Sequence, residues 1–511
     1  MRTRLSIGAL FVTARFLAVT LAACSPNALN MAPPSAETPW TPNGSEKGIW
    51  SMRMRPSQSG ETFAVPANPE LAVMPAPPDI DGGRTYELPE LIDIAERYNP
   101  ETRLAWEHAR QAALAVGMVE ATYLPMITAN VIGGQQSVQS PLPVPLGTQR
   151  YLETTSSGVS SAIALQWLVF DFGQRAFVAD AAKQVALAAN VLFNGQHQKL
   201  IFDVTKAYYI YGASATREKI AQQTLKNSKA IQAAVDDRLL HGLATSVEAA
   251  QARQQVAQSQ LRLVQAQGQQ RDTYQALITA MGVNAMTQIR VADAGQRRLP
   301  DVPTAPLDAM VTLALSQRPD VVASYSAVQA SKAGIKAAEV EFLPKVFVAG
   351  AVASGEGSFD VNGLSNIGQQ ATGTGVLIGA TVPLFDGGLR VAQLKQAQSQ
   401  AAAAENTFKQ TQTLAVTEIV VARNALRTAL ESYKAARALA TAAATTYDAA
   451  FEAYKHGVGT VTVATTADSG LLDARQAEAD AHAAVLTSAA NLAFVLGAMT
   501  STEAAAGMAQ R

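Results

Sequence analysis

Val169–Arg175 reads VFDFGQR, and Leu384–Arg390 reads LFDGGLR. The two stretches share the pattern Phe-Asp-x-Gly-x-Arg, and their aspartates lie 215 positions apart. From Gly173 to His241, a spacing of 68 positions, the chain contains no proline and is rich in Ala, Gln, Lys and Leu. From Gly388 to His456 the spacing is also 68, and the composition is of the same kind. Such stretches predict two helices, each about 100 Å long at about 1.5 Å per residue.

Three further motifs recur in the same order around this one. They are Asn99-Pro100 with Arg318-Pro319, Leu124-Pro125 with Leu343-Pro344, and His241–Thr245 with His456–Thr460. Equivalent residues of the two copies lie 219 positions apart up to the Leu-Pro motif and 215 positions apart from the aspartate onward. The first copy therefore has four extra residues between its Leu-Pro motif and its aspartate. Extra length is tolerated where a loop lies at the surface. The chain is therefore predicted to contain an internal duplication, 86–285 and 306–499.

The hydrophobic period changes at each Leu-Pro motif. Before it the apolar residues keep the spacing of a helix, which the proline ends because it forces the preceding residue out of the α region. After it, alternate residues are apolar, as in Val159–Val169 and Val376–Val382. Each copy is therefore expected to contain a β-hairpin, with loops at Ser137–Glu153 and Ser354–Gly373 and strands long enough to cross a bilayer. A soluble hairpin packed on a core would show the same alternation.

Shorter helices are expected beside the long ones. One runs from Thr245 to about Met281 and another from Pro306 to about Glu341. Stacked end to end they match the length of one long helix, which needs a partner along its length. A helical tunnel satisfies this need, and so does a coiled coil without a lumen.

The N-terminal segment indicates export. Arginines precede a short apolar run that ends in Leu-Ala-Ala-Cys24, the only cysteine of the chain. We interpret 1–23 as a signal peptide and Cys24 as a lipid attachment site, because the sequence resembles a bacterial lipobox. An ordinary signal peptide with a chance cysteine is the alternative. Residues 24–85 are rich in proline, which suits a tether or a small irregular cap, and 500–511 form a tail.

Composition limits the function further. The net charge of −1 gives no electrostatic basis for binding nucleic acid. No run of 18 apolar residues occurs after the signal, so no transmembrane helix is expected. The five histidines lack metal-ligand spacing, and no phosphate-binding loop is present, so we expect neither an enzyme nor a cofactor.

The duplicated order of helix, Leu-Pro, hairpin, Phe-Asp-x-Gly-x-Arg, long helix, Gly-x-x-Thr turn and helix resembles the TolC-like outer-membrane efflux family. The resemblance covers about 86–499. It implies a mainly α-helical homotrimer whose chains each give four strands to one twelve-stranded membrane β-barrel and their helices to a tunnel across the periplasm. It further implies a lipid-anchored protein of the bacterial outer membrane. The implied function is a passive exit duct of a tripartite efflux or type I secretion system, with a periplasmic adaptor and an inner-membrane pump as partners.

At the strand-to-helix junctions we expect Asp171 with Gly173 and Asp386 with Gly388. A carboxylate there satisfies free N–H groups and the helix dipole. This role is structural.

The resemblance places the Gly-x-x-Thr turns at the periplasmic tip, where relatives meet the adaptor. Gly242 and Gly457 suit a positive φ at a helix end, and Thr245 and Thr460 suit the cap of the next helix. Glu248 stands where relatives carry an acid that narrows the entrance, although a plain first-turn acid is the alternative.

The second copy departs from the acidic pattern. Val463 occupies the position that corresponds to Glu248, so a gate would contain three acids per trimer. Asp468 is a further gate residue by proximity alone.

Two other classes remain open at this stage. A lipid-anchored periplasmic adaptor would carry one helical hairpin rather than two, and a structural coiled-coil lipoprotein would carry no membrane strands. Cargo is not encoded in a recognisable motif, and small-molecule efflux is favoured over protein export.

Overall fold

The computed structural model describes residues 35–37, 63, 69–73, 80–146, 149–295, 297–301, 305–361 and 367–499. It forms two compact units, Met1–Ala76 and Pro77–Arg511. In the first unit the described residues include one short 3-10 helix, η2 (Pro69–Ala72). The predicted signal segment 1–23, Cys24 and the tail 500–511 lie outside the described residues.

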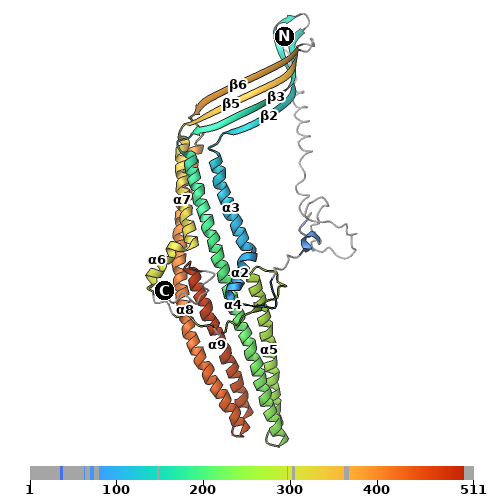
Figure 1. Cartoon of the computed structure of the whole chain (residues 1–511), viewed down its shortest axis with the longest axis vertical. Helices are drawn as coiled ribbons and strands as arrows, with labels where there is room; N and C mark the ends of the chain where they lie inside the picture. Colours follow the sequence, from blue (N-terminus) through green and yellow to red (C-terminus); the bar gives the residue numbers. More distant parts are fainter. Residues whose placement is uncertain are drawn as a thin grey trace, which may run out of the picture. The chain divides into compact units, whose positions relative to one another are not determined.

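The second unit contains the same succession of elements twice (Figure 1). The first copy comprises β1 (Thr85–Tyr86), α2 (Leu88–Tyr98), α3 (Pro100–Ala121), β2 (Met126–Leu146), β3 (Gln149–Phe170), α4 (Gln174–Leu240) and α5 (Ser246–Ala280). The second comprises β4 (Arg290–Val291), α6 (Leu307–Gln317), α7 (Pro319–Glu339), η3 (Val340–Phe342), β5 (Lys345–Val361), β6 (Ile367–Thr381), α8 (Leu389–Lys455) and α9 (Val461–Val495). The expected duplicated architecture is confirmed.

A proline interrupts the helical segment at the start of each copy. The helix expected from Pro306 to about Glu341 is in fact two helices, α6 and α7, and α2 and α3 divide in the same way. Asn99 and Arg318, which precede the prolines, have ψ of 125° and 126°, outside the helical region. The residue before a proline is sterically pushed out of that region, and the proline then begins the next helix.

The four long strands form one antiparallel sheet in the order β2-β3-β5-β6. Its register pairs Ile163 with Val352, which joins the two copies side by side. The hairpin loops expected at Ser137–Glu153 and Ser354–Gly373 are wrong in extent, because strand pairing continues to Leu146 and Gln149 and to Phe359 and Ile367. The first segment contains three prolines and the second is rich in Gly and Ser. Both compositions indicated a loop, while backbone hydrogen bonds extend the sheet.

The two long helices each contain 67 residues and begin directly after Gly173 and Gly388, as expected. Helix α4 packs along α3, α5, α7 and α9, and α8 packs along α7 and α9. The sheet lies at one end of these helices, and the α4–α5 and α8–α9 turns lie at the other (Figure 1).

By length and composition, α4 is the one helix of the described residues that could cross a membrane. From the sequence we expected no transmembrane helix. The qualifying window is 18 residues long, and 6% of it is buried. The whole of α4 is about 100 Å long, over three times the thickness of a bilayer core, and it packs along other helices of the chain.

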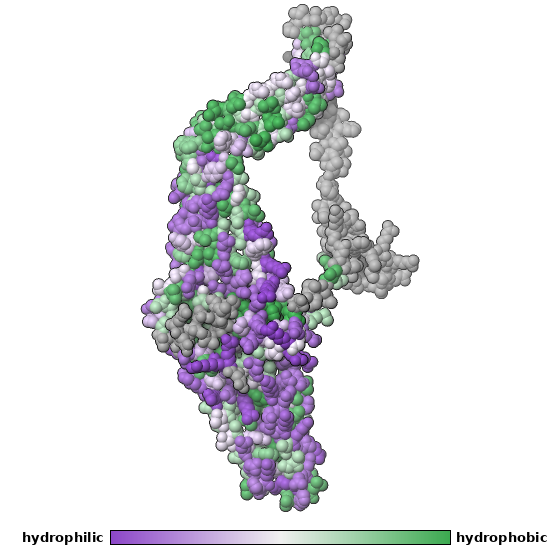
Figure 2. Space-filling view, viewed as in Figure 1, coloured by the Kyte–Doolittle hydropathy of each residue, from purple (hydrophilic) through white to green (hydrophobic). Residues whose placement is uncertain are grey.

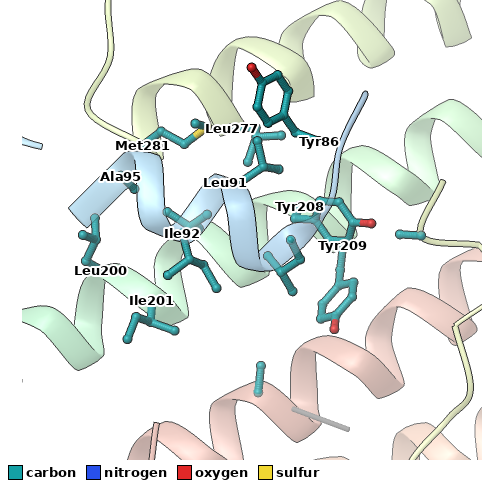
Figure 3. Close-up of a cluster of buried hydrophobic side chains, with 14 of the residues drawn as sticks. Tyr86, Leu91, Ile92, Ala95, Leu200, Ile201, Tyr208, Tyr209, Leu277 and Met281 are labelled. Carbon is teal, nitrogen blue, oxygen red and sulfur yellow. The ribbon is translucent and has the colours of Figure 1, made fainter. Parts of the chain in front are cut away.

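The largest core cluster lies where α2 crosses α4 and α5 (Figure 3). Leu91, Ile92 and Ala95 are fully buried there, against Leu277 of α5 and Met281, which directly follows this helix. The capping box at Glu87 and Glu90 fixes the start of α2. Figure 2 shows hydrophobic residues gathered over the strands, whereas the helical hairpins are mostly hydrophilic.

Candidate functional site

At the first strand-to-helix junction the Asp171 carboxylate accepts the first N–H groups of α4. Its Oδ1 accepts from Gly173 N at 3.1 Å, and its Oδ2 accepts from Arg175 N at 3.1 Å. Gly173 has φ of 88°, a left-handed conformation that glycine adopts without strain. The chain can therefore turn from strand into helix within three residues while the helix N-terminus stays satisfied.

The second junction repeats this geometry. Asp386 accepts from Gly388 N at 3.0 Å and from Arg390 N at 3.2 Å. Gly388 has φ of 90°. Both predicted junction pairs thus lie at helix starts in the same arrangement.

The two junction arginines differ sharply in their contacts. Arg175 donates to Asp171 Oδ2 at 2.7 Å, to the Thr122 carbonyl at 2.9 Å and to the Val169 carbonyl at 3.3 Å. Its guanidinium also lies 4.6 Å from the centre of the Tyr123 ring. Within the part of the chain that the structure describes, the Arg390 side chain makes one ion pair, with Asp386 at 3.5 Å. The first junction therefore joins the end of α3, the end of β3 and the start of α4 through one side chain.

At the first helical turn, Gly242 has φ of 71°, and Leu243 N donates to the Arg238 carbonyl at 2.8 Å. Thr245 and Glu248 form a capping box at the start of α5. Glu248 Oε2 accepts from Thr245 N at 2.7 Å, and Thr245 Oγ1 accepts from Glu248 N at 3.2 Å. The Glu248 carboxylate is therefore engaged with its own helix end.

The second turn has the same backbone but no acid. Gly457 has φ of 78°, and Thr460 Oγ1 accepts from Val463 N at 3.4 Å. The two turns are joined by Arg238, which donates to the Tyr454 carbonyl at 3.1 Å. The ends of α4 and α8 are therefore held together.

Large apolar side chains are exposed at this end of the molecule. Leu240 is 86% exposed and Val458 is 83% exposed, and three more exposed side chains lie beside them: Leu243, Val247 and Val463. Figure 2 shows hydrophobic residues at the free end of the hairpins. Clusters of this kind on a surface are typical of protein contact sites.

The chain matches the family model described as outer membrane efflux protein over residues 91–283 and 310–498. It belongs to the outer membrane efflux protein family. It is 27% identical to outer membrane protein OprJ of Pseudomonas aeruginosa over 376 residues, which is 73% of this chain and 76% of OprJ. It is 23% identical to protein CyaE of Bordetella pertussis over 407 residues, covering 79% of this chain and 82% of CyaE.

Solved structures of channels have the same fold. The structure of the Campylobacter jejuni CmeC outer membrane channel matches with a TM-score of 0.68 at 20% identity, covering 81% of this chain and 87% of CmeC. The expectations of an outer-membrane location and of an exit channel are confirmed by this family membership. The efflux family is one of transport conduits, and within the described residues no group of His, Cys, Asp or Glu could hold a metal ion.

Asp468, the further gate residue that we expected by proximity alone, has a fully buried side chain and lines no open surface of the chain. Asp468 Oδ2 accepts from Ser228 Oγ at 2.7 Å, and Oδ1 accepts from Asn227 Nδ2 at 3.1 Å. Ser228 also bonds Ser259 at 2.8 Å. A polar chain therefore links α9 to α4 and α5.

Sequence reasoning missed this link and the Arg238 contact between the turns. Asp468 lies four residues after Ala464 and three before Leu471, both of which are buried. It therefore stands on the apolar stripe of α9, and that periodicity could have revealed a buried carboxylate. No local pattern distinguishes Arg238 from the exposed arginines of other helices.

Asp468→Asn is expected to change how stability depends on pH. Burial raises the pKa of Asp468 above its ordinary value of 3.8, so the folded chain holds this proton more tightly than the unfolded chain. This contribution is complete below pH 3.8 and is lost as pH rises through the higher folded pKa. Asparagine cannot titrate, so the variant should gain stability relative to the parent between pH 4 and pH 7.

Thermal melts of detergent-solubilised protein at both pH values measure this difference. Asp473→Asn on the same helix is the matched control, since its side chain is 70% exposed. If the melting temperatures of the parent and Asp468→Asn differ by the same amount at pH 4 and at pH 7, protonation of the buried carboxyl is not coupled to folding.

Proposed function

We propose that this chain is the outer-membrane exit duct of a tripartite efflux or type I secretion machine, acting as a passive conduit driven by a pump elsewhere. The observation that carries the proposal is the duplicated unit itself. Each copy joins two strands, long enough for a bilayer, to a helix of about 100 Å, through three residues (171–173) in the first copy and seven (382–388) in the second. A chain of this design extends from an outer membrane far into the periplasm.

We infer that the working form is a homotrimer. The four-stranded sheet has two unpaired edges, β2 and β6, and unpaired strand edges cannot remain in a bilayer core. Three copies joined edge to edge would close twelve strands. The apolar window of α4, of which 6% is buried, would then pack against a neighbouring copy.

The two faces of the sheet suit a wall between lipid and water. Val131, Ile163, Val352 and Val376 share one face and are all more than half exposed. The other face is formed mostly by alanine, glycine and serine, as in the cross-strand pairs Ser160–Gly355 and Ala162–Ala353. We assign the first face to lipid and the second to the lumen.

We propose that the two helical turns meet the periplasmic adaptor. Gly242, Thr245, Gly457 and Thr460 shape these turns, and the exposed apolar side chains around them would supply the contact. Glu248 would contribute one carboxylate per chain at the entrance, three per trimer. Asp468 would stiffen the wall rather than gate it.

We propose Cys24 as the lipid attachment site. One relative is described as probable outer membrane lipoprotein SilC of Salmonella typhimurium. Similarity to these relatives does not identify the transported substrate, because one is named for cation efflux and another for solvent efflux.

Disulfide cross-linking tests the trimer and the exit duct together. Ala129→Cys in β2 would be combined in turn with Thr372→Cys, Thr374→Cys and Val376→Cys in β6. If β2 and β6 of neighbouring copies pair, at least one combination should form covalent dimers and trimers under mild oxidation. Ile163→Cys with Val352→Cys is the control, because these residues face each other within one chain and should leave the mass of a monomer.

The cross-linked trimer should also make liposomes permeable to a small dye. A periplasmic coiled-coil lipoprotein, the competing assignment, would give neither inter-chain bands from any of the three combinations nor dye flux. That pair of results would overturn the proposed function.

A further inference from the structure

A cavity of about 300 Å³ lies between the two copies, in the helical wall. Its walls come from α4, α8 and α9 and from Ala294–Gly295 of the segment that connects the copies. The side chains with chemistry to offer are Tyr209, Tyr433, Arg475, Glu478 and His482. Volumes of this size lie at the lower end of small-molecule sites.

The Tyr209 hydroxyl is buried and unpaired. The residue is 1% exposed, and the hydroxyl has no hydrogen-bond partner among the residues that the structure describes. The adjacent Tyr208, by contrast, donates to the Ala292 carbonyl at 3.2 Å. In Figure 3 the Tyr209 ring extends from α4 toward α9. A buried hydroxyl without a partner is unfavourable, so this group calls for a partner that the cavity can supply.

The α9 wall offers both a cation and acceptors. His482 Nε2 lies 3.0 Å from the Arg297 carbonyl, and a carbonyl only accepts, so Nε2 carries the proton and Nδ1 of the neutral ring is an acceptor. The Tyr433 ring lies edge-on to His482, with centroids 5.6 Å apart. Within the described part of the chain, the side chains of Arg475 and Glu478 make no hydrogen bond and no ion pair.

These side chains belong to the second copy alone. The residues 215 positions before Arg475, Glu478 and His482 are Gln260, Leu263 and Gln267. The first copy therefore folds without an arginine, a glutamate and a histidine at these positions. Their presence on one face of α9 needs a reason other than the shared fold.

We propose that this cavity binds a small monocyclic aromatic carboxylate that carries a second, hydrogen-bond-donating substituent. The carboxylate would bind Arg475 and the Tyr209 hydroxyl, and the ring would lie against Tyr433 and His482. Glu478 would accept from an amino or hydroxyl substituent and repel a second negative charge. The site is separate from the exit-duct function, because it lies in the wall between α4 and α9. A ligand there would bridge the two copies and stabilise the folded chain.

Binding to the purified full-length protein in detergent micelles tests the proposal. Titration calorimetry with 4-aminobenzoate should give saturable binding at one site per chain. Benzyl alcohol, which lacks the carboxylate, should bind at least 10-fold more weakly, and so should phthalate, which carries two. Because binding is measured without a conductance readout, its failure would leave the exit-duct proposal standing.

Two variants locate the binding. Tyr209→Phe keeps the ring and removes the hydroxyl, and Arg475→Gln removes the cation; each should weaken 4-aminobenzoate binding about 5- to 20-fold while the melting curve stays cooperative. Arg437→Gln, elsewhere on the second copy's hairpin, is the control and should bind like the parent. The proposal is overturned if no saturable binding occurs at 10 mM ligand, or if both cavity variants bind as the parent does.

Discussion

Gly282→Ala is expected to destabilise the chain by about 3 to 5 kcal/mol, whereas Gly242→Ala should cost about 1 to 2 kcal/mol. The two glycines have nearly the same backbone, with φ of 69° and 71°, so the strain of a left-handed alanine is common to both. They differ in what a Cβ atom would meet. At Gly282 it would lie 2.7 Å from Asn99 Cγ and 2.8 Å from Asn99 Cα, whereas at Gly242 nothing lies within 4 Å.

The clash at Gly282 falls on a residue that holds the first copy together. Asn99 Oδ1 accepts from Glu101 N at 2.8 Å, which caps α3, and its Nδ2 donates to the Ala280 carbonyl at 3.3 Å. Moving Asn99 would therefore loosen the end of α5 and the start of α3 together. The second copy is built in the same way, since a Cβ on Gly497 would lie 3.2 Å from Arg318 Cα.

Helical circular dichroism during thermal or denaturant unfolding of the purified protein measures both variants. The two variants are informative together because both place an alanine in a left-handed conformation, and only Gly282→Ala also brings its Cβ against Asn99. Equal losses at the two positions would mean that Asn99 moves aside freely and that the two ends of the copy are not coupled through it.

The repeat and the helix lengths could be predicted because they depend on local signals. Proline and glycine at fixed spacing end and begin helices wherever they occur, so Gly173 and His241 bracket α4 as expected. The outer ends of the hairpins could not be predicted in this way. Residues such as Gly357, Ser358 and Gly368 have low strand propensity, and only the ladder of backbone hydrogen bonds with their neighbours keeps them extended.

The site residues show the same division. The capping aspartates and threonines could be placed from sequence, because a cap bonds residues two to four positions away. The contacts of Arg175, Arg238 and Asp468 reach partners far along the chain, such as Tyr454 for Arg238. Proximity in sequence to the turn suggested a gate for Asp468, but the apolar stripe of α9 carries it into the interior.

Arg175→Ala is expected to cost about 3 kcal/mol, a loss several-fold larger than that of Arg390→Ala, although both follow the same Phe-Asp-x-Gly motif. Removing the Arg175 guanidinium leaves the Asp171 carboxylate, with a side chain 6% exposed, without its cation. It also frees the Thr122 and Val169 carbonyls and ends the contact with the Tyr123 ring. Among the described residues, the Arg390 side chain has one partner, Asp386, whose side chain is 23% exposed and closer to water.

Arg175→Lys separates charge from geometry in this prediction. Lysine can keep an ion pair with Asp171, but its single nitrogen cannot replace the planar guanidinium that reaches Asp171, Thr122 and Val169 at once. It should therefore recover less than half of the loss. Thermal unfolding of the four proteins, compared at one detergent concentration, gives the ranking parent, Arg390→Ala, Arg175→Lys, Arg175→Ala from most to least stable. If Arg390→Ala proves as harmful as Arg175→Ala, the corner is held by the aspartate cap alone. The additional bonds that tie α3 and β3 to α4 would then contribute nothing to holding the first copy's strand-to-helix corner, where the sheet joins the helical wall.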